Sequence, residues 1–348
     1  MAYNEEARIA GVLESILAQS FGEFALLIHD NKSTDSTLDV CRDFALRDTR
    51  VSINEGAFNV GALINGYRTR CGYRAKYISI RSSNDLMHPD YYAKAIALLE
   101  QDPLVGLAYS HGSEFSDDIT TAVPAPDGFK IDTRNMDGLN SALEVMQRYT
   151  SPFSLWGVCR RNILEMCRPY QFSHGGDHIF IAEMSLYGAV APVDGRLDFR
   201  YVPKADARGA IAANADSQLE EHVRGIAKTS LFYGVKQHMP FTDLIWGHIE
   251  MFSLARVDDV LKSNLIVMGV EMLKARFSPF LTDEAARFVV GINQILDGFK
   301  DVLIRQNPNL FMWLQKIKKE LDKIKFLDTY PLVGLVELES RVSQLMNG

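Results

Sequence analysis

Two short polar segments near the start of the chain carry side chains that could hold a nucleotide. Ala2–Glu6 stands directly before a predicted helix, and Asp30–Asp35 follows a short apolar run. An aromatic ring such as that of Tyr3 can stack on a base, and a carboxylate can accept a hydrogen bond from a base N–H. Asp30 and Ser33 are also residue types that build turns and cap helices, which is the commoner role of either residue taken alone.

A third polar segment, Ser82–Asp90, also follows an apolar run and contains Asn84 and Asp85. Acidic residues at the end of a strand can hold a divalent cation against a diphosphate, although Asp and Pro also commonly begin helices. No G-x-G-x-x-G motif follows the first predicted strand, and the chain contains no G-x-x-x-x-G-K-[ST] motif. The sequence therefore does not contain the motifs that would indicate a dehydrogenase or a P-loop enzyme.

The elements between these segments alternate between helical and strand periodicity. The predicted helices are Glu5–Gln19, 34–45, Val60–Arg70, Pro89–Glu100, Leu139–Tyr149 and Asp177–Tyr187, and the predicted strands are Phe24–His29, Val51–Asn54, Lys76–Arg81, Leu104–Tyr109 and Leu197–Val202. This alternation predicts an α/β fold with a parallel sheet covered by helices. Ligands of such sheets bind beyond the carboxyl ends of the strands, where the polar segments would lie.

Composition narrows the class of protein. The 348 residues are 47% hydrophobic and 23% charged, as in soluble globular proteins, which excludes disorder and coiled coil throughout. A net charge of −7 argues against broad electrostatic binding of nucleic acid. The four cysteines form no C-x-x-C pair, so reduced thiols are expected rather than a zinc site. Without a membrane-spanning apolar stretch or a signal-peptide pattern, we expect a cytoplasmic location.

The pattern changes along the chain. Residues 111–140 are turn-rich and predict a long functional loop or a small insertion, whereas the pattern is almost entirely helical from about Asp216 onward. We therefore predict an α/β domain over residues 1–215 and a helical subdomain over 216–348, punctuated by Pro240, Pro279, Pro308 and Pro331. Near its end, an apolar stripe among lysines comprises Phe311, Leu314, Ile317, Leu321 and Ile324. An amphipathic helix packed on its own domain is the main interpretation, and a homo-oligomer contact or docking on an anionic membrane are the alternatives.

The polar segments, taken in order, resemble the motifs of the family 2 glycosyltransferases over roughly residues 1–205. Ala2–Glu5 resembles their Pro-x-Tyr-Asn-Glu motif, Asp30–Asp35 their Asp-Asn-x-Ser-Thr-Asp motif, and Asn54–Asn65 approximates Asn-x-Gly-x-x-x-Ala-x-Asn. Asn84 and Asp85, with Pro89 beyond them, resemble the acidic motif. Each match alone is weak, but the ordered set is specific. The resemblance implies a GT-A-like, Rossmann-like fold with a mostly parallel sheet.

The resemblance also implies roles for individual residues. Tyr3 and Glu5 would line the nucleoside site, Asp30 would accept a hydrogen bond from the base, typically uracil, and Asn59 would face the diphosphate. Asn84 and Asp85 would bind the diphosphate and a divalent cation, Mn²⁺ or Mg²⁺. Two departures stand out. Family members usually begin with a buried strand before the position of Ala2, and their acidic motif Asp-x-Asp-Asp reads Ser82-Ser83-Asn84-Asp85 here, so Asp85 would supply the carboxylate.

A later segment resembles the acceptor side of these enzymes. Trp156–Arg161 matches it, and Asp177 falls where the family places its general base at the start of a helix. Asp177 would also stabilise that helix as a cap. His174 and His178 flank it and are more often ordinary polar side chains than ligands. Arg200 falls where relatives often carry an arginine after the last strand, although a surface arginine is the simpler interpretation.

The resemblance to the family implies an inverting glycosyltransferase. It would move a sugar from a nucleoside-diphosphate sugar, with UDP expected, to a hydroxyl of a glycan or lipid-linked acceptor in polysaccharide synthesis. The expected location is the cytoplasm or the inner face of the membrane. The alternative is a non-catalytic relative that binds a nucleotide or acts as a scaffold. A nucleotidyltransferase on a similar fold is a third possibility, but such enzymes carry a glycine-rich phosphate loop that this sequence does not contain.

Overall fold

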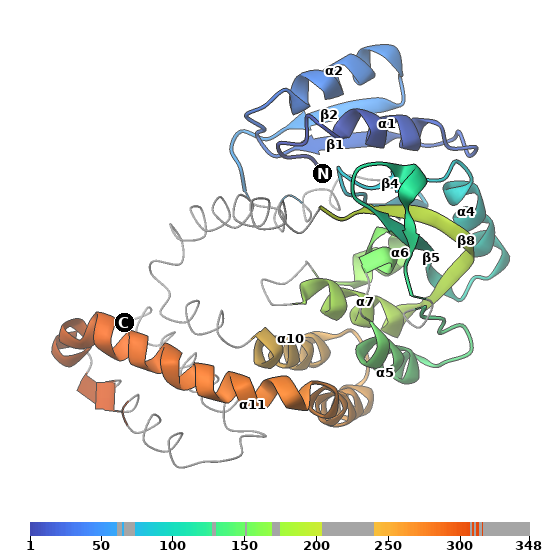
Figure 1. The fold of residues 1–348 in the computed structure, drawn as a ribbon. Coiled ribbons are helices and arrows are strands. Elements are labelled where there is room, and N and C mark those ends of the chain that lie inside the picture. Colours follow the sequence, from blue (N-terminus) through green and yellow to red (C-terminus); the bar gives the residue numbers. More distant parts are fainter. Residues whose placement is uncertain are drawn as a thin grey trace. The chain divides into compact units, whose positions relative to one another are not determined.

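The computed structural model describes a set of residues in which the chain forms two compact units. The described residues are 1–60, 65, 74–126, 130–149, 152–168, 175–203, 240–306, 308–309, 311–312 and 315. The first unit comprises Met1–Gln171 and Phe180–His222, and the second comprises Phe172–Ile179 and Val223–Gly348 (Figure 1). Of the predicted helix over 60–70, only Val60 and Asn65 lie within the described residues.

The first unit begins with a small parallel sheet. Strand β1 (Leu26–Asp30) pairs in register with β2 (Val51–Glu55). Helices α1 (Ile9–Leu17) and α2 (Thr37–Arg47) pack their apolar sides on it, and the shared core contains Ala2, Ile9, Leu13, Ile28, Cys41 and Val51. Both helices arise from apolar residues at helical spacing, as expected.

A second, larger sheet has the strand order β3-β7-β5-β8-β4, with β6 beside β5. Its strands are β3 (Tyr77–Ser79), β4 (Leu86–Met87), β5 (Val105–Phe115), β6 (Val123–Pro124), β7 (Val158–Arg160) and β8 (Ala189–Tyr201). The long β5–β8 ladder is parallel, whereas the short β3–β7, β5–β7, β4–β8 and β5–β6 ladders are antiparallel. The predicted α/β class is confirmed, and parallel pairing holds for the long ladders only.

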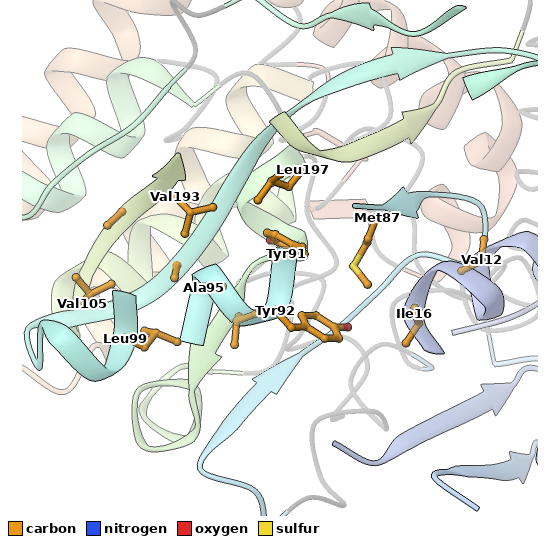
Figure 2. Close-up of a cluster of buried hydrophobic side chains, with 13 residues drawn as sticks. Val12, Ile16, Met87, Tyr91, Tyr92, Ala95, Leu99, Val105, Val193 and Leu197 are labelled. Carbon is orange, nitrogen blue, oxygen red and sulfur yellow. The ribbon is translucent and has the colours of Figure 1, made fainter. Parts of the chain in front are cut away.

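Helix α4 (Tyr91–Gln101) anchors the core of this sheet. It turns Tyr91, Tyr92, Ala95 and Leu99 inward against β5 and β8, and Val12 and Ile16 of α1 belong to the same cluster (Figure 2). The remaining described helices of this unit are α5 (Gly138–Arg148), α6 (Arg161–Met166), most of α7 (Gly176–Tyr187), and the 3-10 turns η1 (Ile119–Thr121) and η3 (Pro152–Trp156).

The structure corrects the predicted loop over 111–140 at its beginning. Strand β5 continues to Phe115, with Ser110 and His111 buried. Such polar residues are tolerated in a buried strand because they are hydrogen-bonded. The Ser110 hydroxyl donates to the His111 carbonyl (2.7 Å) and accepts from the Leu197 N–H (2.8 Å). The polar residues Ser110 and His111 interrupt the apolar pattern, so the sequence did not indicate that this central strand continues to Phe115.

Strand β8 is likewise longer than the predicted strand over 197–202, since it begins at Ala189. Pro192 and Gly195 interrupt the expected strand pattern in the sequence. The ladder register shifts between Ser110 and His111, opposite Val193 and Arg196, and Gly195 lies in this stretch with φ = +99°. Glycine adopts that conformation without the penalty that a Cβ brings, so the irregularity is accommodated within one strand.

The second unit is helical in its described part, with α10 (Pro240–Leu254) and α11 (Asp259–Gln306). Pro240 opens α10 as predicted, but Pro279 does not end α11, because a helix can continue past a proline at the loss of one backbone hydrogen bond. Most of the apolar stripe from Phe311 to Ile324 lies outside the described residues. No helix in the described part of the chain is both long and apolar enough to cross a membrane.

Candidate nucleotide-sugar site

The turn after β1 is built around the Asp30 side chain. Asp30 is 1% exposed, and its carboxylate accepts hydrogen bonds from the Ser33 N–H (3.0 Å) and the Ser33 hydroxyl (2.5 Å). This is an Asx-type turn, in which an Asp side chain accepts a hydrogen bond from the backbone a few residues further on, and the bonds hold the carboxylate in place. The structure thus shows that Asp30 builds this turn. Its role in binding a nucleotide base stays a prediction.

The first two polar segments are joined side by side. The Asn4 side chain accepts a hydrogen bond from the Thr34 N–H (2.8 Å), and the Asn4 N–H donates to the Ser33 hydroxyl (3.1 Å). The Glu5 N–H donates to the Thr37 hydroxyl (2.7 Å). Segments about thirty residues apart in sequence therefore form one polar surface at the carboxyl end of β1, the position where open α/β sheets bind ligands.

Asn59 joins the same surface through Asn31. The Asn31 side chain donates to the Asn59 side chain (2.6 Å) and accepts from the Val60 N–H (3.0 Å). The chain reaches this point by passing close to the turn at Gly56, where an added Cβ would lie 2.9 Å from the Asp30 carbonyl oxygen. Only glycine permits that approach without a shift of the backbone.

A chain of contacts connects the first polar segment with the third. The Arg8 guanidinium pairs with Glu5 (2.7 Å) and lies over the Tyr201 ring, 4.8 Å from its centroid. The Tyr201 N–H donates to the Asp85 carboxylate (2.8 Å) at the end of β8. Arg8 and Tyr201 were not among the sequence candidates, although Arg8 is one turn after Glu5 and is the cation nearest to the first motif in the sequence. Burial raises the pKa of Glu5, and Arg8 partly offsets that shift.

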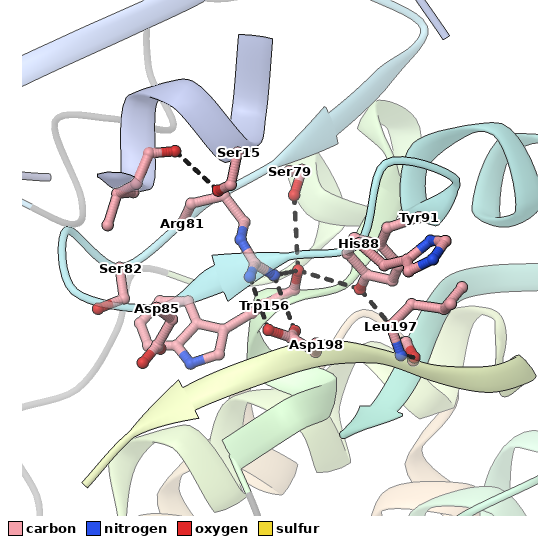
Figure 3. Close-up of polar contacts among 12 residues, drawn as sticks. Ser15, Ser79, Arg81, Ser82, Asp85, His88, Tyr91, Trp156, Leu197 and Asp198 are labelled. Atoms are coloured by element: carbon pink, nitrogen blue, oxygen red, sulfur yellow. Dashed lines mark hydrogen bonds and ion pairs between the residues drawn. The ribbon is translucent and has the colours of Figure 1, made fainter. Parts of the chain in front are cut away.

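Beneath Asp85 lies a buried ion pair that the sequence analysis missed. Arg81 and Asp198 are 7% and 0% exposed and form two parallel hydrogen bonds of 2.9 and 2.7 Å. Arg81 also donates to the Trp156 carbonyl (2.9 Å), so the pair fastens β3, β8 and η3 together (Figure 3). Burial alone would lower the pKa of the Arg81 guanidinium, but Asp198 raises it well above its usual value.

Asp85 lies close to the same pair, and none of the cations in the described part of the chain is at hydrogen-bond distance from its carboxylate. Burial, reinforced by the nearby Asp198 carboxylate, raises its pKa to about 6. Asn84, half-buried beside it, receives a hydrogen bond from the Ser82 hydroxyl. Within the described residues, no cluster of three or more acidic, histidine or cysteine side chains could hold a metal ion. One carboxylate and one amide suit only the kind of Mg²⁺ or Mn²⁺ site in which substrate phosphates supply further ligands.

Of the residues predicted for the acceptor side, some have a structural role and others have no role that their contacts assign. Arg160 donates to the Val105 carbonyl (2.7 Å) and to the Leu99 and Asp102 carbonyls at the end of α4, so it fastens a helix terminus. Arg200 is half-exposed and pairs with Glu114 (3.2 Å). Asp177 is half-buried in the first turn of α7, while His174 lies outside the described residues.

His178, next to Asp177, belongs to a buried chain of hydrogen bonds in the second unit. Arg276 donates to His178 Nε2 (3.1 Å), His178 Nδ1 lies 2.9 Å from His248 Nε2, and His248 Nδ1 lies 2.8 Å from the Leu244 carbonyl. The carbonyl can only accept, so His248 carries its proton on Nδ1 and accepts at Nε2. His178 must then donate from Nδ1 and accept from Arg276. The chain therefore requires both imidazoles to be neutral.

The sequence comparisons bear on part of the first unit. Residues 1–145 match the family model described as glycosyl transferase family 2, so this part of the chain is similar to that family. The match covers the Tyr3, Asp30 and Asp85 segments and confirms the resemblance drawn from them.

Two curated relatives match part of the chain. An uncharacterized glycosyltransferase of Haemophilus influenzae is 28% identical over 102 residues, which is 29% of this chain and 31% of the relative. The putative glycosyltransferase EpsE of Bacillus subtilis is 30% identical over 102 residues, 28% of this chain and 36% of the relative. The chain thus aligns with about a third of the length of each curated relative.

Solved structures resemble this chain over most of its length. Staphylococcus aureus TarS 1-349 in complex with UDP-GlcNAc aligns with a TM-score of 0.57 at 13% identity, covering 92% of this chain and 86% of that chain. The mannosyltransferase PcManGT of Pyrobaculum calidifontis, in complex with GDP-Man and Mn²⁺, aligns with a TM-score of 0.50 at 14% identity, covering 94% and 86%. These likenesses confirm the GT-A fold.

Proposed function

We propose that this protein is an inverting glycosyltransferase that moves a sugar from a nucleoside-diphosphate sugar to an acceptor hydroxyl. The observation that carries the proposal is the joining of the separate family motifs into one surface. Asn4 and Glu5 bond to the segment from Ser33 to Thr37, and Arg8 and Tyr201 connect Glu5 to Asp85. A structural turn alone would not need three distant polar segments at one edge of the fold.

The donor would lie along this surface. Tyr3 and Glu5 would contact the nucleoside, Asp30 would accept from the base, and Asn59 would face the diphosphate. A UDP-sugar is the proposed donor, supported by the fold shared with TarS, which was solved with UDP-GlcNAc. Arg8 offers a cation near the diphosphate, a role the sequence did not suggest.

A divalent cation would be held by Asp85 and Asn84 together with the donor's phosphate oxygens. When bound, Mn²⁺ or Mg²⁺ neutralises charge that develops on the leaving diphosphate. The Mn²⁺ complex of the structurally similar PcManGT supports this assignment. Asp85 must be ionised to serve, and its pKa of about 6 predicts that metal-dependent activity falls as the pH drops below 6.

Asp177 is the proposed general base. Its carboxylate would take the proton from the acceptor hydroxyl while that oxygen attacks the anomeric carbon and the bond to the diphosphate breaks. A direct displacement of this kind inverts the anomeric centre. The position of Asp177 in the first turn of α7 favours a negative charge there, which is the form that a base requires. The proposed acceptor is a glycan or lipid-linked hydroxyl in polysaccharide synthesis, in the cytoplasm or at the inner face of the membrane.

The Asp177→Asn variant tests this assignment. Asparagine preserves the size of the side chain in the first turn of α7 but does not act as a base, so we expect transfer to fall by roughly 10²–10⁴-fold. UDP affinity by calorimetry and the melting temperature should stay near the wild-type values. Asp137, the N-cap of α5, provides a matched control, since Asp137→Asn should leave transfer unchanged. The structure places Asp177 within the first turn of α7, one residue after the helix begins, and not at the predicted cap position. Wild-type transfer rates in the Asp177→Asn variant would restrict Asp177 to a structural role in that turn.

A non-catalytic nucleotide-binding or scaffold protein is the second candidate. It is favoured by the burial of the Asp30 and Asp85 carboxylates, which bond to Ser33 and to the Tyr201 backbone. Release of UDP from UDP-sugars, measured with and without Mn²⁺, separates the candidates. A transferase hydrolyses its donor slowly even without an acceptor, whereas a scaffold binds UDP and releases none from the sugar.

A further inference from the structure

The proposed base Asp177 stands in a helical turn that belongs to the second unit, whereas the rest of its helix belongs to the first. Residues Phe172–Ile179 are part of the second unit, and α7 continues from Phe180 in the first. Terminal turns of helices open more readily than helix interiors. A catalytic group, however, has to be held within about 0.5 Å of its productive position. The contacts that hold this turn therefore bear on how Asp177 could act.

The first turn of α7 packs on helix α10 at two points. At Gly175, just before the helix, φ is +65° and an added Cβ would lie 2.7 Å from Leu244 Cδ1. At His178, which is 5% exposed, Nδ1 lies 2.9 Å from Nε2 of the fully buried His248. Two attachments three residues apart fix both the direction of the turn and its rotation about the helix axis.

The hydrogen bonds of the histidine chain also fix the two rings. His248 is tied to its own helix through the Leu244 carbonyl, and Arg276 of α11 donates to His178 Nε2. Each ring is therefore engaged at both of its nitrogens, so neither can turn over without the loss of a buried hydrogen bond. The His178 ring is thus held by α10 and α11 together.

The direction of the Asp177 side chain follows from that of His178. Neighbouring side chains of an α-helix project about 100° apart around the axis, since a turn contains 3.6 residues. The half-buried Asp177 therefore leaves α7 on a different side from His178. A rotation of the turn that moved His178 would move the Asp177 carboxylate by a comparable distance.

We propose that His178, His248 and Arg276 are positioning residues for the Asp177 carboxylate, which hold the first turn of α7 in the orientation in which Asp177 takes the acceptor proton. The inference rests on the proposed function, because all three residues act through Asp177, and none of them needs to touch the substrate. A chain that served stability alone would act independently of Asp177, so a double-mutant cycle separates the two roles.

The test measures UDP release by the full-length protein from a panel of UDP-hexoses and UDP-N-acetylhexosamines. His248→Leu removes the acceptor for His178 and keeps an apolar side chain of similar size. We expect kcat to fall roughly 10- to 100-fold, as for a catalytic group displaced by about 1 Å, while KM for the donor stays unchanged because the donor surface belongs to the first unit. His248→Gln can still accept at that position and should recover most of kcat.

Amide exchange at Ile179 reports on the turn without any substrate. The Ile179 N–H donates to the Gly175 carbonyl (3.0 Å), so its exchange should become faster in His248→Leu. Leu265→Ala is the matched control for stability, since Leu265 is 0% exposed in α11, about three turns before Arg276. This control should lower the melting temperature and leave kcat of the folded protein unchanged.

The cycle with Asp177→Asn decides between the two roles. In that background His248→Leu should lower kcat no further, because the group that it positions is already lost. Equal falls in kcat in both backgrounds would overturn the inference, since His248 would then act on something other than Asp177. A kcat of His248→Leu that equals the wild-type value, corrected for the folded fraction, would make the chain structural only, even with faster exchange at Ile179.

Failure of the inference can be told apart from failure of the proposed function. A wild-type rate of UDP release in Asp177→Asn alone would remove the proposed base and the inference with it, but would leave the transferase standing. A wild-type protein that releases no UDP from any sugar of the panel would contradict the transferase itself.

Discussion

The two units each bury a polar cluster, and the clusters handle charge differently. In the first unit, Arg81 and Asp198 are both charged and satisfy each other through paired hydrogen bonds. In the second unit, His178 and His248 form a chain that requires neutral imidazoles, with Arg276 at its end. Burial lowers the pKa of His248 to about 4, which secures the neutral form at physiological pH.

The difference teaches how burial acts on an acid and on a base. Burial disfavours the charged form of either group, so it raises the pKa of Asp85 to about 6 and lowers that of His248 to about 4. For Asp85 the folded pKa is above the unfolded value, so its contribution to stability is lost as the pH rises from about 4 through 6. For His248 the folded pKa is below 6.5, so its contribution is lost as the pH falls from 6.5 through 4. The two units should therefore respond to pH in opposite directions.

The largest expected effect is that of Asp198→Ala. The substitution leaves the Arg81 guanidinium buried without its paired carboxylate, which should cost about 3–5 kcal/mol of the free energy of unfolding. Denaturant unfolding monitored by amide exchange in β5 and β8 measures this loss in the first unit. The double variant Arg81→Met/Asp198→Leu is the control, since apolar replacement of both partners should recover most of the stability. A double variant as unstable as Asp198→Ala would mean that packing, rather than charge, dominates at this site.

A smaller effect is expected from acid at the histidine chain. Between pH 7 and pH 4 the second unit should lose roughly 3 kcal/mol through His248, as measured by amide exchange in α10. His248→Gln does not titrate but can still donate and accept, so its stability should change less over the same range. If the wild type and His248→Gln show the same pH slope, His248 does not set the acid sensitivity of this unit.

The smallest effect is expected from Asp85→Asn. At pH 8 the variant no longer has to ionise a buried carboxyl group, and an amide oxygen can still accept from the Tyr201 N–H, so stability should rise by roughly 1–3 kcal/mol. The gain should shrink as the pH falls toward 4. The same variant should weaken Mn²⁺-dependent binding of UDP. That result would mean that the buried Asp85 carboxylate lowers stability but serves to bind the cation. A gain in stability that is equal at pH 8 and pH 4 would argue against an ionised Asp85 in the native protein.

The sequence predicted the elements wherever periodicity was clear. Helices α1, α2, α4, α5 and α7, with strands β1 and β2, lie close to their predicted ranges, because each has apolar residues at one regular spacing. Strands β5 and β8 were predicted too short, since Ser110, His111, Pro192 and Gly195 break the apolar pattern. The Ser110 hydroxyl accepts from the Leu197 N–H, and His111 Nε2 lies 2.9 Å from the Pro126 carbonyl oxygen, contacts that form only when segments distant in the sequence come together.

The candidate site divides in the same way. Order and residue type along the chain were enough to select Tyr3, Glu5, Asp30 and Asp85, because motifs of this family are local in sequence. Arg8, Tyr201 and the Arg81–Asp198 pair were missed. Their importance depends on neighbours as far as 117 positions away, which no local pattern contains.

What the sequence alone determined about this protein is its α/β character and the order of its polar segments, because these follow from local periodicity and short motifs. Tertiary structure alone decided which charges are buried, which are paired and which are neutral. Desolvation depends on everything packed around a side chain, so Asp85 and His248 acquire their shifted pKa values only in the fold.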